Sequence, residues 1–253
     1  MLLLCSNDDG ILAPGLVCLE QAARALGDVF VVAPDREQSA TSHSLTLHHP
    51  LRPVQLSEHR WQVDGTPTDC VMLAIEALMP TRPDFVLSGV NHGPNMGEDV
   101  LYSGTVAAAM EGLALGIPAI AVSYAGRDFH TVGVSLDQYV EPLAKLFRHI
   151  TALPAFPQHT LLNVNIPPIP AAEIKGVRLT RLGRRVFSDS IAKMKDPWGR
   201  PIYWIGGGSV TWSAGEGTDV DAVREGYVSI TPLHLDITNE ARLTDSESWW
   251  IAP

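Results

Sequence analysis

Short apolar runs of strand length alternate with helical segments over the first two-thirds of the chain. The mostly apolar runs at 1–4, 29–33 and 85–90 favour strands of a parallel sheet that is covered on both faces. Strands are also predicted at 117–122 and 160–166, short edge strands within 45–64, and helices at 14–26, 66–79, 106–115 and 134–150. This alternation predicts an α/β fold, a Rossmann-like doubly wound sheet that is mainly parallel.

The composition of the sequence changes after Pro168: charged residues are dispersed, and aromatic residues occur in pairs such as Tyr203-Trp204. We predict that 177–180 and 201–205 form the strands of a projecting hairpin, which favours a subunit interface over a surface excursion of a monomer. A strand at 226–232 is expected to return to the main sheet. The predicted division of a single domain (1–253) is an α/β core with the active site at 1–166, a projecting hairpin and oligomerisation region at 167–226, and a return strand with a C-terminal tail at 227–253.

The formal net charge of -10, without a Lys/Arg cluster, argues against a nucleic-acid polymer or an anionic membrane surface as partner. Cys5, Cys18 and Cys70 are widely spaced and lack metal-site spacing, which predicts reduced thiols in a cytoplasmic protein. Asn7 interrupts the N-terminal apolar stretch too early for a signal peptide, and no apolar run approaches membrane-spanning length.

Two adjacent carboxylates, Asp8 and Asp9, follow the first predicted strand directly, and Gly10 comes next. In open α/β sheets, ligands bind beyond the carboxyl ends of the strands. Adjacent carboxylates repel each other, and a cation between them removes that repulsion. An ordinary solvated Asp-Asp-Gly turn explains these residues as well, so the pair alone leaves both interpretations open.

Polar loops at 7–10, 34–44 and 91–95 each follow a predicted strand and should open on the same edge of the sheet. They offer carboxylates, hydroxyls and amides, which are ligands suited to Mg²⁺ or Mn²⁺. Ser103-Gly104-Thr105 precedes an alanine-rich helix and could bind an anion with backbone N–H groups, although ordinary capping explains the tripeptide alone.

Several familiar phosphate and hydrolase motifs are absent: the sequence has no P-loop, no G-x-G-x-x-G after the first strand and no G-x-S-x-G elbow. In a dehalogenase-type phosphatase the nucleophile would fall on Asn7, which cannot form an aspartyl phosphate. A receiver-type signalling domain would need a phosphoacceptor Asp and a later Lys that the chain does not show. His43, His92 and His234 are possible proton carriers without further support.

Taken together, these stretches closely resemble the SurE family (survival protein E), metal-dependent phosphatases that act on nucleoside monophosphates. The matching motifs, in order over nearly the whole chain, are Asn7-Asp8-Asp9-Gly10-Ile11 with Pro14-Gly15, Val32-Ala33-Pro34-Asp35-Arg36 leading to Ser39, Ser44-Leu45-Thr46, Gly65-Thr66-Pro67-Thr68-Asp69-Cys70-Val71, Ser88-Gly89-Val90-Asn91, Gly93-Pro94-Asn95, Tyr102-Ser103-Gly104-Thr105-Val106, Gly217-Thr218-Asp219 and Gly226-Tyr227-Val228-Ser229-Ile230-Thr231-Pro232-Leu233.

The resemblance implies one divalent metal ion per subunit, Mg²⁺ or Mn²⁺, and assigns site residues by position. The implied metal ligands are Asp8, Asp9, Ser39 and Asn91. The implied phosphate-binding residues are Asn95, Ser103, Gly104 and Thr105. We predict Asp8 and Asn95 as the catalytic residues, with Asp8 as the base because a carboxylate beside the metal can take the proton. Ser42 stands where many members have glycine, and His92 occupies a variable position.

The implied activity is hydrolysis of nucleoside 5'-monophosphates, with 3'-monophosphates as further substrates, by direct attack of water on phosphorus. The family's C-terminal elements join subunits, which implies a homodimer or homotetramer. Two alternatives stay open: a phosphatase for polyphosphate or another non-nucleotide ester, and a sensor that binds nucleotides without hydrolysis.

Overall fold

The computed structural model describes residues 1–126, 135–154, 156–186, 191–205, 211–213 and 215–243. Its main element is a nine-stranded sheet with the order β3-β4-β2-β1-β5-β6-β7-β13-β8. The strands are β1 (Leu2–Ser6), β2 (Asp28–Pro34), β3 (Pro53–Ser57), β4 (Arg60–Val63), β5 (Phe85–His92), β6 (Ala119–Tyr124), β7 (Leu161–Ile166), β8 (Val177–Leu179) and β13 (Val228–Leu233). All neighbours in this sheet are parallel except β3 with β4 and β7 with β13, so the predicted mainly parallel α/β fold is confirmed.

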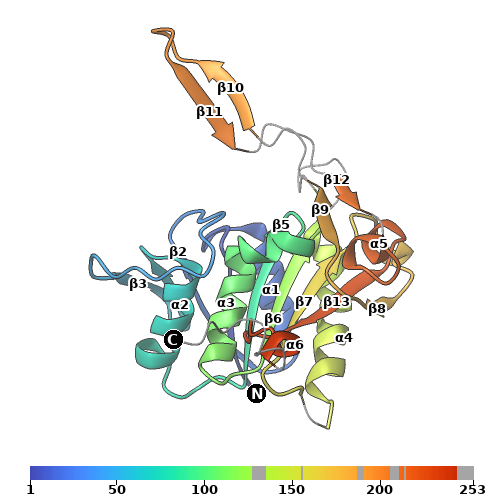
Figure 1. Ribbon diagram of the computed structural model, residues 1–253. Coiled ribbons are helices and arrows are strands. Elements are labelled where there is room, and N and C mark those ends of the chain that lie inside the picture. The colour runs from blue at the N-terminus through green and yellow to red at the C-terminus, as the bar shows by residue number, and fades with distance from the viewer. Residues whose placement is uncertain (127–134, 155, 187–190, 206–210, 214, 244–253) are drawn as a thin grey trace, which may run out of the picture.

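Helices cover both faces of the sheet, which is why its central strands are buried over nearly their whole length. The helices are α1 (Pro14–Arg24), α2 (Pro67–Leu73), α3 (Gly104–Ala114), α4 (Val140–Thr151), α5 (Asp219–Arg224) and α6 (Glu240–Leu243). Side chains of α1 and α4 share one hydrophobic core, and side chains of α2 and α3 share the other, on the opposite face. Figure 1 shows this layered arrangement, and β5 is the middle strand of the sheet order.

Local signals in the sequence explain the starts of α1, α2 and α3. α1 begins at Pro14, a residue whose missing N–H costs nothing in the first turn. Thr66 and Asp69 form a reciprocal capping box at the start of α2. The side chain of Ser103 accepts a hydrogen bond from the backbone N–H of Val106, so α3 starts two residues earlier than predicted.

Element boundaries differ from the predictions by a few residues. The helix predicted at 66–79 ends its α-helical part at Leu73 and continues as a π-helical turn, Ala74–Leu78. The helix predicted at 134–150 is a 3₁₀ turn (Leu136–Tyr139) followed by α4, and residue 134 lies outside the described residues. β5 continues to His92, so the loop predicted to begin at Asn91 instead begins after the strand. Short 3₁₀ turns also occur at Gly97–Leu101 and Ala171–Glu173.

Of the two strands predicted for the projecting hairpin, the one at 201–205 is confirmed as β11 (Pro201–Ile205), whereas its predicted partner at 177–180 was wrong. Residues 177–179 form β8, which joins the edge of the main sheet parallel to β13. The hairpin instead pairs β10 (Ile191–Lys195) with β11 (Pro201–Ile205). The turn between them is short, and the Asp196 side chain accepts hydrogen bonds from the N–H groups of Trp198 and Arg200. That local closure favours β10 as the partner of β11 over the distant run at 177–179.

The hairpin stands away from the body of the molecule on a base formed by β9 (Arg184–Val186) and β12 (Thr211–Ser213), as Figure 1 shows. We call residues 184–213 the arm. The strand predicted to return to the main sheet at 226–232 is confirmed as β13, antiparallel to β7. The tail at 244–253 lies outside the described residues.

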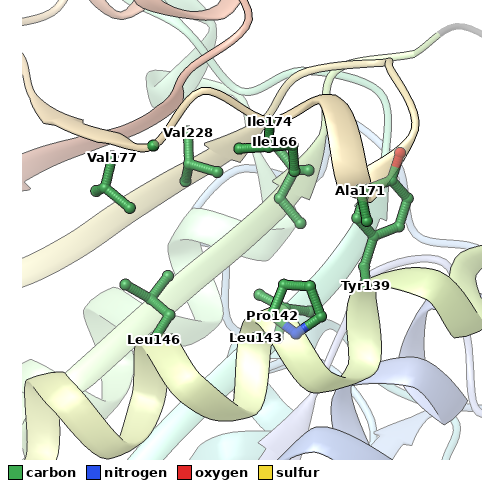
Figure 2. Close-up of a pocket in the computed structure, with 10 residues that line it drawn as sticks. Tyr139, Pro142, Leu143, Leu146, Ile166, Ala171, Ile174, Val177 and Val228 are labelled. Atoms are coloured by element: carbon green, nitrogen blue, oxygen red, sulfur yellow. The ribbon is translucent and has the colours of Figure 1, made fainter.

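A cavity of about 230 Å³ lies between α4 and the β7, β13 and β8 side of the sheet (Figure 2). It is lined by Tyr139, Pro142, Leu143, Leu146, Ile166, Ala171, Ile174, Gly176, Val177 and Val228. This lining has neither carboxylates nor basic groups, so it offers no chemistry for a phosphate ester.

None of the described helices is long and apolar enough to cross a membrane. Cys5, Cys18 and Cys70 are buried and unpaired, as predicted.

Candidate active site

Asp8 and Asp9 follow the carboxyl end of β1, which lies between β2 and β5 in the sheet. The chain turns sharply after them because Gly10 adopts a φ of +100°, which favours glycine. A side chain at Gly10 would also lie 3.1 Å from the backbone of Arg36. Asp8 is only 5% exposed, whereas Asp9 is partly exposed. The pair is therefore held in a tight turn rather than in the solvated turn that the sequence left open.

Three other segments converge on this pair through hydrogen bonds. The Thr105 hydroxyl, in the first turn of α3, donates to Asp8 Oδ1. The backbone N–H of Gln38, in the loop after β2, donates to the backbone carbonyl of Asp8 (2.7 Å). The backbone N–H of His92, at the end of β5, donates to Asp9 Oδ2 (3.0 Å). The predicted meeting of polar segments at one sheet edge is thus present in the structure.

Both carboxylates are electrostatically unfavourable in the metal-free protein. The pKa of Asp8 is raised to about 6, mainly by burial and also by the neighbouring Asp9, while hydrogen bonds from Thr105 oppose the shift. Burial also raises the pKa of Asp9, while the N–H of His92 lowers it. Two carboxyl groups that resist ionisation side by side are the electrostatic setting that a bound cation reverses.

The donor chemistry around the pair fits a hard divalent cation. Ser39 follows Gln38, whose backbone N–H bonds the Asp8 carbonyl. The Ser39 hydroxyl donates to Glu37 Oε1 (2.7 Å), so its oxygen lone pairs stay available for a cation. The Asn91 side-chain nitrogen donates to the carbonyl of Gly93 (2.9 Å), which leaves the amide oxygen as the ligand atom. Among the described residues, no three His, Cys, Asp or Glu side chains gather for a metal. The candidate set therefore has two charged ligands, with hydroxyl and amide oxygens completing it.

The first turn of α3 is packed directly onto Asp8. A side chain at Gly104 would place its Cβ 2.7 Å from the Cβ of Asp8 and 2.9 Å from Asp8 Oδ2, so only glycine fits. Ser103 uses its hydroxyl as the helix cap, and Thr105 uses its hydroxyl to hold Asp8. What this segment offers an anion is therefore mainly the N-terminal backbone of an 11-residue helix.

Asn95 is buried, and its position is fixed by two strands of the sheet. Its side-chain nitrogen donates to Ser123 Oγ on β6 (2.8 Å), and its backbone N–H donates to Asn165 Oδ1 on β7 (3.0 Å). Its backbone carbonyl accepts from Asn163 Nδ2 (2.8 Å) and Asn165 Nδ2 (3.0 Å). Among the described residues, no hydrogen bond joins Asn95 to Asp8 or Asp9. Sequence reasoning missed this network, although two asparagines in an apolar strand were a signal for it.

The loop that carries Ser39 is fastened to the start of α3. Ser42 has a φ of +57°, in keeping with the glycine that the resemblance implies there. Its hydroxyl donates to the carbonyl of Leu101 (2.5 Å), and its N–H donates to the carbonyl of Tyr102 (3.3 Å). His43 Nε2 lies 2.8 Å from Glu111 Oε2, a buried carboxylate of α3.

The three histidines considered as proton carriers have different places in the structure. His43 pairs with Glu111, and His92 contributes its backbone N–H to Asp9. His234 follows β13, whose last residue pairs with Leu161 at the opposite edge of the sheet. The structure therefore separates His234 from the candidate site.

Comparisons with known proteins agree with this arrangement. Residues 3–189 match the family model described as survival protein SurE. The chain is 70% identical over 253 residues to a protein of Gemmatimonas aurantiaca named 5'-nucleotidase SurE, covering 100% of both chains. It is 51% identical to a protein of the same name from Geobacter metallireducens, covering 98% of this chain and 97% of that one. The crystal structure of the SurE protein from Aquifex aeolicus superimposes with a TM-score of 0.85 at 42% identity, covering 98% of this chain and 99% of that one. The chain therefore belongs to the SurE family.

Proposed function

We propose that this protein is a divalent-metal-dependent phosphomonoesterase that hydrolyses nucleoside 5'-monophosphates, and 3'-monophosphates as well, to nucleoside and phosphate. The names of its full-length relatives support a nucleotidase. The observation that carries the proposal is the packing of the N-terminus of α3 onto the buried Asp8, beside Asp9. This packing supports the proposal because an acidic pair suits a cation and the neighbouring backbone N–H groups suit an anion.

In the proposed mechanism Asp8, Asp9, Ser39 and Asn91 would hold one Mg²⁺ or Mn²⁺, which when bound supplies positive charge and acidifies a water molecule. The N-terminal backbone of α3, from Ser103 to Thr105, binds the phosphate oxygens. The Asn95 side chain stabilises the charge that develops on them.

Asp8 acts as the general base in this mechanism. Thr105 occupies Asp8 Oδ1, so Oδ2 takes the proton of the attacking water. The water oxygen forms the new bond to phosphorus as the bond to the nucleoside oxygen breaks, and the electron pair leaves with that oxygen, which takes a proton from solvent to become the nucleoside hydroxyl. Asp8 then returns its proton to solvent. With a pKa of about 6 the carboxyl is mostly ionised at neutral pH, as a base must be.

We also propose that the arm joins subunits in a homodimer or homotetramer and that the protein acts in the cytoplasm. The arm carries exposed large apolar side chains on both strands of its hairpin, which suits a subunit contact. These side chains are Ile191, Met194, Ile202, Tyr203, Trp204 and Ile205, with Trp198 in the turn.

Phosphate release from a panel of nucleoside 5'- and 3'-monophosphates, polyphosphate and p-nitrophenyl phosphate tests the activity. The assay is run with Mn²⁺ or Mg²⁺ and again with EDTA, on the wild type, Asp8→Asn and Asp28→Asn. Asp28 is a matched control because it is an exposed aspartate at the opposite end of the sheet. We expect metal-dependent release from 5'-monophosphates that Asp8→Asn abolishes and Asp28→Asn retains. Binding without release would instead indicate a sensor, and preferred cleavage of polyphosphate would shift the substrate class.

A further inference from the structure

A buried carboxylate, Asp219, lies where the arm joins the body of the molecule, in the motif Gly217-Thr218-Asp219 that has no role in the proposed mechanism. Its side chain is 0% exposed. Asp219 Oδ1 accepts hydrogen bonds from the backbone N–H groups of Gly183 (2.7 Å) and Val220 (2.8 Å). Asp219 Oδ2 accepts one from the backbone N–H of Gly97 (2.9 Å).

Two of these bonds, from Gly183 and Gly97, connect the base of the arm to the loop between two candidate site residues. Gly183 directly precedes β9, the outgoing strand of the arm, and Asp219 follows β12, the returning strand. Gly97 opens the 3₁₀ turn between Asn95 and Ser103. One carboxylate thus holds both ends of the arm against the loop that leads from Asn95 to the first turn of α3.

The contact around this carboxylate is close and specific. Gly97 has a φ of +54°, and a Cβ there would lie 2.8 Å from the carbonyl oxygen of Gly183. Met96 packs into a small apolar cluster with Val220 and Val223. The loop and the base of the arm therefore cannot shift independently without breaking packing as well as hydrogen bonds.

Asp219 is satisfied only by backbone N–H groups, because no Lys or Arg pairs with it among the described residues. A buried carboxylate costs free energy unless all its hydrogen bonds are made in good geometry. Burial raises its pKa, while the three N–H groups lower it. Its hydrogen bonds are therefore demanding in direction, which suits a group that fixes the relative position of two segments.

We propose that Asp219 is a positioning residue for the phosphatase reaction. It fixes the position of the loop from Asn95 to Ser103 relative to the base of the arm. This inference rests on the proposed function, because it assumes that Asn95 and the start of α3 contact the phosphate. The inference gives the Gly-Thr-Asp motif a structural role in the site, and it means that the base of the arm supports the site loop.

The substitution Asp219→Asn tests the inference with little change in shape. An asparagine can keep its oxygen towards Gly183 and Val220, but then its NH₂ group faces the N–H of Gly97, donor against donor. The matched control is Asp221→Asn, on the same helix, since Asp221 accepts from the N–H of Gly215 in its own segment. We expect kcat to fall about tenfold or more in Asp219→Asn at unchanged metal saturation, and to stay within about twofold of wild type in Asp221→Asn.

Hydrogen exchange of residues 93–102, followed by mass spectrometry in the metal-free protein, gives a readout that does not depend on activity. We expect faster exchange there in Asp219→Asn and wild-type exchange in Asp221→Asn. Equal loss of kcat in both variants would make the effect one of general stability and overturn the proposal. Unchanged kcat in Asp219→Asn would also overturn it, whatever the exchange shows.

If Asp219→Asn does not fold, Gly183→Ala provides the second test, because its Cβ would lie 2.9 Å from Asp219 Oδ1 at the base of the arm. The same loss of kcat is expected, and wild-type kcat would refute the inference. Activity is measured with a nucleoside 5'-monophosphate and with p-nitrophenyl phosphate. A wild type that cleaves neither refutes the proposed function, whereas the exchange experiment still decides whether Asp219 orders the loop.

Discussion

Asp8→Asn should stabilise the metal-free protein at neutral pH although it removes a central site residue. The pKa of Asp8 is about 6 in the folded protein and 3.8 in a free side chain. The folded state therefore binds more protons between these values, and the free energy of unfolding falls as pH rises through them. A difference of roughly 2 pKa units corresponds to about 3 kcal/mol. Asparagine escapes this loss because it does not ionise, and its oxygen can still accept from Thr105.

Urea unfolding in EDTA at pH 4 and pH 7.5 measures this effect. We expect Asp8→Asn to exceed the wild type by up to about 3 kcal/mol at pH 7.5 and to approach it at pH 4, close to the unfolded pKa, where most of the difference in ionisation between the folded and unfolded states has disappeared. Asp28→Asn, at an exposed position, should show no such pH-dependent gain. Mn²⁺ should then stabilise the wild type and leave Asp8→Asn unchanged. An Asp8→Asn variant less stable than the wild type at pH 7.5 in EDTA would refute the electrostatic reasoning.

Three further predictions concern the same edge of the sheet. Gly104→Ala should lower kcat/KM at least about a hundredfold, because its Cβ would lie 2.7 Å from the Cβ of Asp8; steady-state kinetics would contradict this with a loss below about tenfold. Asn165→Leu, which removes two hydrogen bonds to the Asn95 backbone, should destabilise the protein by about 2 kcal/mol in urea unfolding and lower kcat; stability equal to wild type would show that the network is not needed. Mn²⁺ affinity, measured by calorimetry, should weaken about tenfold between pH 7.5 and pH 5 as Asp8 becomes protonated, and a pH-independent affinity would exclude Asp8 as a ligand.

The sheet could be predicted from the sequence because its strands are buried on both faces. The continuous apolar runs of β1 and β2 exclude strands with one face exposed to water. The helix α1 between them returns the chain to the start of the sheet, so the two strands pair in parallel. The partner of β11 could not be predicted, because short runs of mixed polarity do not specify a partner strand. The run at 177–179 takes the free edge of β13 instead, where Thr180 lies within 2.7 Å of the hydroxyls of Ser229 and Thr231.

Part of the candidate site could likewise be predicted from the sequence, and part could not. That Asp8, Asp9 and Asn91 lie at one edge followed from strand direction, because the carboxyl ends of parallel strands meet there. The groups that hold them could not be predicted, since a backbone N–H such as that of Gln38 has no signature in the sequence. Asp219 shows the same limit: its hydrogen bonds with Gly97 and Gly183 join segments far apart in the chain, and only folding brings them together.

The central claim is that the acidic pair after β1 holds a catalytic divalent cation. Equilibrium dialysis of the EDTA-treated protein against Mn²⁺ at pH 7.5, followed by metal analysis, tests it most directly. The account predicts one Mn²⁺ per subunit in the wild type and in Asp28→Asn, and none in Asp8→Asn at the same free concentration. Equal Mn²⁺ binding by the wild type and Asp8→Asn, or no binding by either, would contradict it.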